Sequence, residues 1–137
     1  MQSDFESIDF YGLRLSAIDK NKFVNQICQF ISENHKMVIF GYSLGSIRLL
    51  NRYAIMYKFG WEQADVMIID GRGLYLLGKL LGFPFKDDIS IPELSRILLH
   101  ISEKNNYSIL FLGTEPEINN KATENIRNKF KNIIVHD

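Results

Sequence analysis

The residues that could carry out chemistry gather at Asp70, where a carboxylate stands beside two glycines. Asp70, Gly71, Arg72 and Gly73 follow the apolar run Val66–Ile69 and precede a helical stretch. Glycines let a backbone approach a ligand closely, and the free N–H groups at a helix start favour anions such as a diphosphate. A carboxylate at the end of a strand can act as a general base. The simpler alternative is that Asp70 caps the next helix and the glycines form the turn.

A second motif, Gly41-x-Ser43-x-Gly45, resembles the nucleophile elbow of α/β-hydrolases. In such an enzyme a histidine activates the serine, and His136 with Asp70 would complete the order Ser, Asp, His. However, the hydrolase fold needs several strands before its elbow, and only about forty residues precede Ser43. The serine hydrolase is therefore the lesser alternative.

Composition limits the other classes of chemistry. The chain has 137 residues, of which 46% are hydrophobic and 23% charged, and its 16 basic and 16 acidic side chains give a net charge of zero. This profile is typical of a globular domain without a long-range field that attracts nucleic acid. Since no group of His, Cys, Asp and Glu has metal-ligand spacing, we expect no metal and no cofactor. The single Cys28 and the lack of a secretory leader predict a cytoplasmic protein.

Local signals mark several helices and a hairpin. Two short apolar segments flank Tyr11 and Gly12, which predicts a β-hairpin near the start. An amphipathic pattern begins after Asp19, a residue that favours the N-cap position, and continues to about residue 34. Thr114 and Glu117 form a capping-box pattern around Pro116, which predicts another helix start.

Short apolar runs that alternate with helical segments predict the fold class. Strands are expected at residues 37–40, 66–69, 109–112 and 133–135. Such runs are typical of a parallel sheet that helices cover on both faces. We therefore expect one α/β domain over residues 1–137, with a Rossmann-like, mostly parallel sheet, helices on both faces and a short N-terminal β-hairpin.

The carboxyl ends of the strands should hold the ligand crevice, because loops and helix N-termini converge there in a sheet of this kind. Asp70 is the candidate catalytic residue at this edge. The candidate substrate-binding residues are Tyr42, Ser43, Gly71, Arg72, Gly73 and Gly113.

Four segments after residue 60 have the order and spacing of a known family. Ala64, Asp65 and residues 66–73 match a pattern of AD, an apolar run and DGxG, and residues 80–85 look like LLGxPL. Residues 109–126 look like the strand and helix FLGGKPGVAEKAAENL, and residues 135–137 look like the start of GxHDGYF. Through these motifs the chain resembles the WecG/TagA/CpsF glycosyltransferases over residues 8–137, most specifically after residue 60.

The resemblance implies a metal-independent, inverting sugar transfer in the synthesis of bacterial wall teichoic acid, common antigen or capsule. An N-acetylmannosamine-type sugar would pass from a UDP-sugar to a polyprenyl-diphosphate-linked acceptor. Asp70 matches the aspartate proposed as the base for the acceptor hydroxyl, and Gly71 and Gly73 would shape the acceptor pocket. The resemblance also implies further donor contacts in a part of the family's domain beyond Asp137, and peripheral association with the inner face of the cell membrane.

Two elements of the family pattern differ in this sequence. Tyr42 and Leu44 stand where the family has the threonine and asparagine of TxN, and Asp88 stands where it has the arginine of RVxGxD. Leucine offers no hydrogen bond, and an anion in place of a cation repels a diphosphate. A catalytically degenerate binding module of the same family is therefore the alternative to an active transferase. A homo-oligomer or a complementing chain stays open as the partner.

Overall fold

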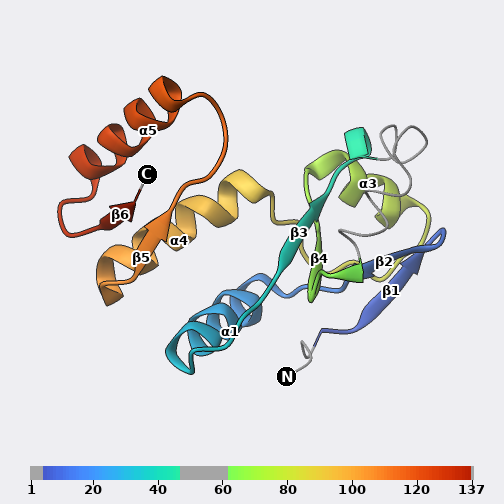
Figure 1. Ribbon diagram of the computed structural model, residues 1–137. Coiled ribbons are helices and arrows are strands. Elements are labelled where there is room, and N and C mark those ends of the chain that lie inside the picture. The colour runs from blue at the N-terminus through green and yellow to red at the C-terminus, as the bar shows by residue number, and fades with distance from the viewer. Residues whose placement is uncertain (1–4, 47–61, 137) are drawn as a thin grey trace. The chain divides into compact units, whose positions relative to one another are not determined.

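The chain forms two compact units, Met1–Ile91 and Pro92–Asp137. The computed structural model describes residues 5–46 and 62–136, and Figure 1 labels their helices and strands. Within these residues lie three two-stranded sheets, one antiparallel and two parallel. The α/β class with parallel strand pairs and an N-terminal hairpin is thereby confirmed, and the Rossmann-like arrangement is consistent with it. A single domain over residues 1–137 stays a prediction.

The N-terminal hairpin joins β1 (Ser7–Phe10) to β2 (Leu13–Ser16), with Phe10 paired to Leu13. Its two turn residues, Tyr11 and Gly12, both have positive φ, at 53° and 82°. Positive φ at both central residues is typical of the tight turns that match the twist of a hairpin. Asp9 Oδ1 also accepts a hydrogen bond from the Gly12 N–H at 2.6 Å. The predicted hairpin is confirmed.

The first helix, α1, spans Lys20–Ser32 and begins where the sequence predicts. Asp19 is its N-cap, and the Asp19 carboxylate accepts a hydrogen bond from the Lys22 N–H at 3.0 Å. The buried side chains of α1 recur three and four residues apart, which places them on one face of the helix. They are Phe23, Ile27 and Phe30.

The central parallel pair consists of β3 (Ile39–Tyr42) and β4 (Val66–Ile69), with Tyr42 in register with Ile69. All four residues of β4 are buried, as expected for a strand covered on both faces. Strand β4 has the predicted bounds, whereas β3 begins two residues later than predicted. Just before β3, the Val38 carbonyl accepts a hydrogen bond from the Val66 N–H at 3.2 Å, while the Val38 N–H donates to the side chain of Asp65 at 2.7 Å.

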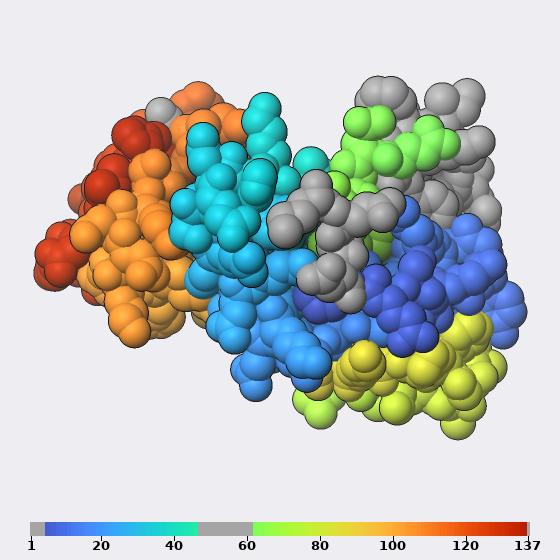
Figure 2. All heavy atoms as spheres, turned by 90° about the horizontal axis from the view of Figure 1, so that it is seen from below, coloured from blue at the N-terminus to red at the C-terminus, as the bar shows by residue number. Residues whose placement is uncertain are grey.

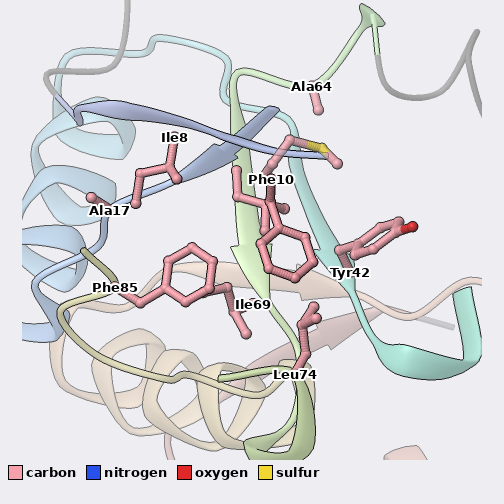
Figure 3. Close-up of a cluster of buried hydrophobic side chains, with 10 residues drawn as sticks. Ile8, Phe10, Ala17, Tyr42, Ala64, Ile69, Leu74 and Phe85 are labelled. Atoms are coloured by element: carbon pink, nitrogen blue, oxygen red, sulfur yellow. The ribbon is translucent and has the colours of Figure 1, made fainter. Parts of the chain in front are cut away.

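The hydrophobic core of the first unit lies between the hairpin, the β3–β4 pair and the segment that follows them. In Figure 3 the side chains of Phe10, Ile69, Leu74 and Phe85 lie together. The buried residues of this cluster are Ile8, Phe10, Leu15, Ala17, Tyr42, Ala64, Met67, Ile69, Leu74 and Phe85.

Helix α3 (Arg72–Leu80) follows β4, and a non-helical segment, residues 81–90, leads from it to the next helix. Gly78 faces Phe85 so closely that an added Cβ would overlap the Phe85 ring. The Asp87 N–H donates to the Ile18 carbonyl at 3.1 Å, and Asp87 Oδ2 accepts from the Lys20 N–H at 2.8 Å. This segment, yellow in Figure 2, therefore lies beside the blue N-terminal residues.

The second unit is built from α4 (Ile91–Asn105), β5 (Ser108–Leu110), α5 (Pro116–Lys129) and β6 (Ile134–His136). Helix α4 starts at the last residue of the first unit. Strands β5 and β6 are parallel, with Ile109 in register with Val135. The Arg127 side chain ties α5 to β6, because one of its N–H groups donates to the Val135 carbonyl at 2.8 Å.

The predicted capping box at the start of α5 is wrong. Pro116 is the first helical residue, as expected, but the N-cap is Glu115 and no side chain makes a capping hydrogen bond there. Thr114 instead has φ of 62°, in the left-handed region. A residue at an N-cap typically has extended backbone angles, so Thr114 cannot take that position.

Candidate active site

The Asp70 carboxylate lies directly after β4 and is half-buried. The Asp70 backbone N–H donates to the Tyr42 carbonyl at 2.7 Å, and this bond continues the β3–β4 pairing by one residue. Its side-chain Oδ1 accepts a hydrogen bond from the Ile91 N–H at 3.0 Å. Among the residues that the structure describes, Oδ2 accepts no hydrogen bond. Within the described residues, one carboxylate oxygen is therefore held in place and the other has no hydrogen-bond partner.

Asp70 caps a helix, but not the helix that follows it in the chain. Gly71 is the N-cap of α3, and no side chain makes a capping hydrogen bond there. The N–H that Asp70 does satisfy belongs to Ile91, the first residue of α4. The first-turn N–H groups of a helix have no partner within the helix. The start of α3 thus keeps its donors free of side-chain caps, which favours an anion at this position.

The glycine after Asp70 is required by the backbone. Gly71 has φ of 101° and ψ of 140°, and an added Cβ would have open space around it. The constraint is therefore the backbone conformation and not steric crowding, because residues other than glycine rarely adopt these φ and ψ angles. Gly73, in contrast, has ordinary helical angles, and its nearest neighbour is Leu44 Cδ1, at 3.0 Å from the position of an added Cβ.

We expect Gly71→Ala to lower the free energy of unfolding by about 1–3 kcal/mol because of this backbone strain. Gly73→Ala should change it by less than about 1 kcal/mol, since alanine favours the helix and the flexible end of Leu44 can move. Urea unfolding of both variants measures the difference. Equal losses of stability would contradict a special role for the backbone at Gly71.

Ser43 forms a reciprocal pair with Ser46 at the start of the next helical turn. Ser43 Oγ accepts from the Ser46 N–H at 3.4 Å, and Ser46 Oγ accepts from the Ser43 N–H at 3.3 Å. The two hydroxyl oxygens are 3.2 Å apart. This is the geometry of a capping box. A structural role at a helix start therefore accounts for Ser43, and a nucleophilic role stays an untested prediction.

Gly41 and Ile91 help to position Asp70, a role that the sequence patterns did not predict. A Cβ at Gly41 would lie 2.5 Å from Ile91 Cγ1 and 3.2 Å from Asp70 Cβ. Only glycine therefore lets the start of α4 approach β3 and place the Ile91 N–H on Asp70. Gly41 directly follows the predicted strand 37–40, and in the structure it lies inside β3, where a glycine often marks a close approach of another segment.

The other predicted site residues have different environments. Tyr42 is fully buried in the core, whereas Leu44 and Arg72 are exposed. Asp88 is half-buried in the segment between α3 and α4. Gly113 belongs to the second unit, where it follows β5 with φ of 114°. The structure thus brings Tyr42, Ser43 and residues 70–73 to the carboxyl ends of β3 and β4, as predicted for one edge of a parallel pair.

Cavities of the first unit lie away from Asp70. The largest described here is about 510 Å³ and lies between the N-terminal residues, α1 and Lys86. Two others, of about 390 and 320 Å³, are lined by Arg14 and Glu62 among others. None of the described lining residues belongs to the cluster around Asp70. The described residues around Asp70 therefore line none of these three cavities.

Residues 5–46 and 62–136 contain neither a metal-binding cluster nor a membrane-spanning helix. No group of three or more His, Cys, Asp and Glu side chains there could hold a metal ion. No helix there combines the length and the apolar character needed to cross a bilayer.

The arrangement around Asp70 can accept a proton and hold an anion. The open carboxylate oxygen can take a proton from a hydroxyl group, and the uncapped start of α3 can stabilise negative charge close by in the chain.

A comparison with curated proteins found no match. The family model described as Glycosyl transferase WecG/TagA/CpsF family matches residues 8–137. The chain therefore belongs to the WecG/TagA/CpsF family of glycosyl transferases.

Proposed function

We propose that the chain transfers an N-acetylmannosamine-type sugar from a UDP-sugar to a polyprenyl-diphosphate-linked acceptor at the inner face of the cell membrane. Family membership supports the coarser part of this proposal, which is glycosyl transfer in cell-envelope polysaccharide synthesis. It likewise supports, in general terms, a sugar-nucleotide donor and a lipid-linked acceptor. The particular sugar, the acceptor and the place of the reaction go beyond the family assignment.

The observation that supports the proposal is the difference in hydrogen bonding between the two carboxylate oxygens of Asp70. Oδ1 is fixed by the Ile91 N–H, which orients the carboxylate, while Oδ2 accepts no hydrogen bond from the described residues. In the proposed reaction Oδ2 takes the proton of the acceptor hydroxyl. The acceptor oxygen attacks the anomeric carbon on the face opposite the leaving group, the bond from that carbon to the UDP oxygen breaks, and the configuration inverts.

Negative charge on the departing UDP is the second requirement of the reaction. The start of α3 follows Asp70 by two residues and has no side-chain cap, so its N–H groups can stabilise a diphosphate. The exposed Arg72 side chain adds a cation there. A positioned general base contributes about 10²- to 10⁴-fold to a rate, and Asp70 is the residue to which we assign this contribution.

Direct assay of the full chain tests the proposal. The protein is incubated with UDP-N-acetylmannosamine and a short-chain polyprenyl-diphosphate-linked amino sugar, and mass spectrometry follows the product. Addition of one N-acetylhexosamine to the acceptor, with release of UDP and without added metal, is the expected result. Hydrolysis of the donor without a glycosylated acceptor, or no turnover of any UDP-sugar, would contradict the proposal.

A second candidate function is a binding module that has lost catalysis, and the position of Leu44 favours it. The Leu44 side chain lies against Gly73 at the start of α3, where the family pattern has a hydrogen-bonding asparagine. An apolar side chain there offers nothing to a sugar hydroxyl or a phosphate. Calorimetry with UDP and with UDP-sugars separates the two candidates. Tight binding of UDP without any turnover supports the binding module.

A further inference from the structure

The cavity of about 510 Å³ in the first unit, which we call the α1 cavity, has the size of a small-molecule site. Pockets that hold small molecules typically have volumes of about 300–1,000 Å³. Phe5 and Glu6, one face of α1 and Lys86 enclose the cavity. Helix α1 is blue in Figure 2, and the segment with Lys86 is yellow. Since no described residue of the cluster around Asp70 lines this cavity, it is a candidate for a second site.

Helix α1 contributes a row of polar side chains to the cavity. The row consists of Lys22, Asn25, Gln26 and Gln29, which all line the cavity. These residues are three and four apart, so they share one face of the helix. None of them is among the buried residues of α1, so packing of the core does not explain why polar side chains gather there.

Gln26 is the member of this row that most needs a ligand. Its side-chain oxygen, Oε1, is buried and accepts no hydrogen bond from the residues that the structure describes. Most buried polar atoms of native proteins have a partner, and a buried acceptor without one lowers stability. Because Gln26 lines the cavity, a rotation of its amide can bring Oε1 to an N–H or O–H group of a bound molecule. The cavity therefore favours a ligand that donates a hydrogen bond.

The charges around the cavity favour an uncharged ligand. Lys22 and Lys86 supply two cations, and Glu6 and Asp19 supply two carboxylates. A nucleotide or another multiply charged anion would meet one carboxylate for each ammonium group, which offsets the attraction. A molecule with many hydroxyl groups instead finds hydrogen-bond donors and acceptors in these charged groups and in the amides of α1. Saccharides are uncharged molecules of this kind.

Phe5 and Ala17 add an apolar part to the lining of the cavity. The Phe5 ring is held by the buried Phe23 ring, whose centroid lies 5.5 Å away in an edge contact. Aromatic and aliphatic side chains give a ligand contact area, while a few polar groups fix its orientation. An N-acetylamino group on a sugar combines an N–H donor with a methyl group. Gln26 Oε1 can accept from the N–H, and the apolar part of the lining can hold the methyl group.

We propose that the α1 cavity binds an uncharged saccharide that carries an N-acetylamino group. The N–H of that group donates to Gln26 Oε1, its methyl group packs against Phe5 and Ala17, and the sugar hydroxyls bind the other polar side chains of the row. In a transferase such a site holds a glycan apart from the reacting hydroxyl group at Asp70. That use rests on the proposed function, whereas binding itself does not.

Two disaccharides that differ in the N-acetylamino group test the proposal. The full chain, isotope-labelled for NMR, is titrated with N,N′-diacetylchitobiose and with cellobiose, which has the same linkage and lacks the N-acetylamino groups. We expect diacetylchitobiose to shift the side-chain amide signals of Gln26 and to bind at least about tenfold more tightly than cellobiose. Equal affinity for the two sugars, or no shift at Gln26 up to about 10 mM of either sugar, would overturn the proposal.

Matched glutamine variants locate the site. Gln26→Met removes the amide and keeps an unbranched side chain, so diacetylchitobiose should bind about tenfold more weakly or worse. Its melting temperature should rise, because a buried acceptor without a partner is removed. The control is Gln63→Met, since Gln63 is exposed and lines none of the three cavities. If both variants lose affinity equally, or if Gln26→Met melts at a lower temperature than the unchanged protein, the proposal is wrong.

A charge variant separates a saccharide site from an anion site. Lys22→Gln with Lys86→Gln removes both cations and keeps a hydrogen-bond donor at each position. The affinity for diacetylchitobiose should change by less than about threefold, because exposed charges contribute little to the binding of an uncharged molecule. Inorganic phosphate is the probe for the alternative. If phosphate shifts the Gln26 signals of the unchanged protein but not those of the double variant, the cavity is an anion site and the proposal fails.

The saccharide site and the proposed function can fail separately. If diacetylchitobiose binds at Gln26 but the chain transfers no sugar to the short-chain acceptor, the saccharide site holds and the proposed function fails. Transfer to that acceptor without binding of diacetylchitobiose at Gln26 gives the reverse conclusion.

Discussion

Asp70→Asn is expected to lower the rate of sugar transfer by about 10²- to 10⁴-fold while leaving the fold intact. Asparagine keeps an oxygen that can accept the hydrogen bond from the Ile91 N–H, which Asp70 Oδ1 accepts at 3.0 Å. It replaces the open Oδ2 by an amide nitrogen, which cannot take the acceptor's proton. Initial rates of the variant and the unchanged protein, with thermal melts in parallel, measure both effects.

Asp70→Ala is the matched control for the structural role of this side chain, which is the hydrogen bond from the Ile91 N–H. Alanine removes the base and the helix cap together, so we expect the same loss of rate with an additional loss of about 1 kcal/mol in the free energy of unfolding. If Asp70→Asn transfers sugar at the full rate, Asp70 is not the base. If both variants are destabilised equally, the lost rate reports on folding rather than on chemistry.

The largest effect on stability is expected at the contact between Gly78 and Phe85. Phe85 is 1% exposed in the core, and its truncation in Phe85→Ala should lower the free energy of unfolding by about 3–5 kcal/mol. Gly78→Ala should lower it by about 1–3 kcal/mol, because a Cβ there would overlap the Phe85 ring. Urea unfolding curves of both variants give the two values.

The double variant tests the reason for the cost at Gly78. In the Phe85→Ala background the ring is gone, so Gly78→Ala should become stabilising by up to about 1 kcal/mol, which is the helix propensity of alanine over glycine. A matched change at Gly73, whose neighbour is only the end of Leu44, should not depend on residue 85. Simple additivity of the Gly78 and Phe85 changes would contradict a steric origin.

Sequence patterns predict the elements whose signals are local. Strand β4 has the predicted bounds because four consecutive apolar residues, all buried, leave only one place for a strand covered on both faces. The start of α1 follows from the short-range bond between Asp19 and the Lys22 N–H. The hairpin follows from two turn residues that accept positive φ. In each case the deciding interaction joins residues at most three apart or reflects burial alone.

Interactions between distant residues explain what the sequence could not show. At the edge of β3 the Val38 N–H donates to the side chain of Asp65, which lies 27 residues further along the chain. The helix that Asp70 caps begins 21 residues after it, so spacing suggested the wrong helix. Helix α5 begins at Pro116 as predicted, but its capping box is absent for a local reason, because the Thr114 backbone is left-handed. The substrate-binding roles of Tyr42, Ser43 and Gly113 stay predictions.

Selection for folding and selection for activity act on different oxygens of Asp70. One oxygen serves the fold by holding the Ile91 N–H, and the other takes the acceptor's proton in the proposed function. A lineage that has given up sugar transfer can accept asparagine at this position and still fold, whereas a lineage that keeps the reaction cannot. The residue at position 70 in natural variants would therefore distinguish genes whose products have lost sugar transfer from genes whose products keep it, before any protein is purified.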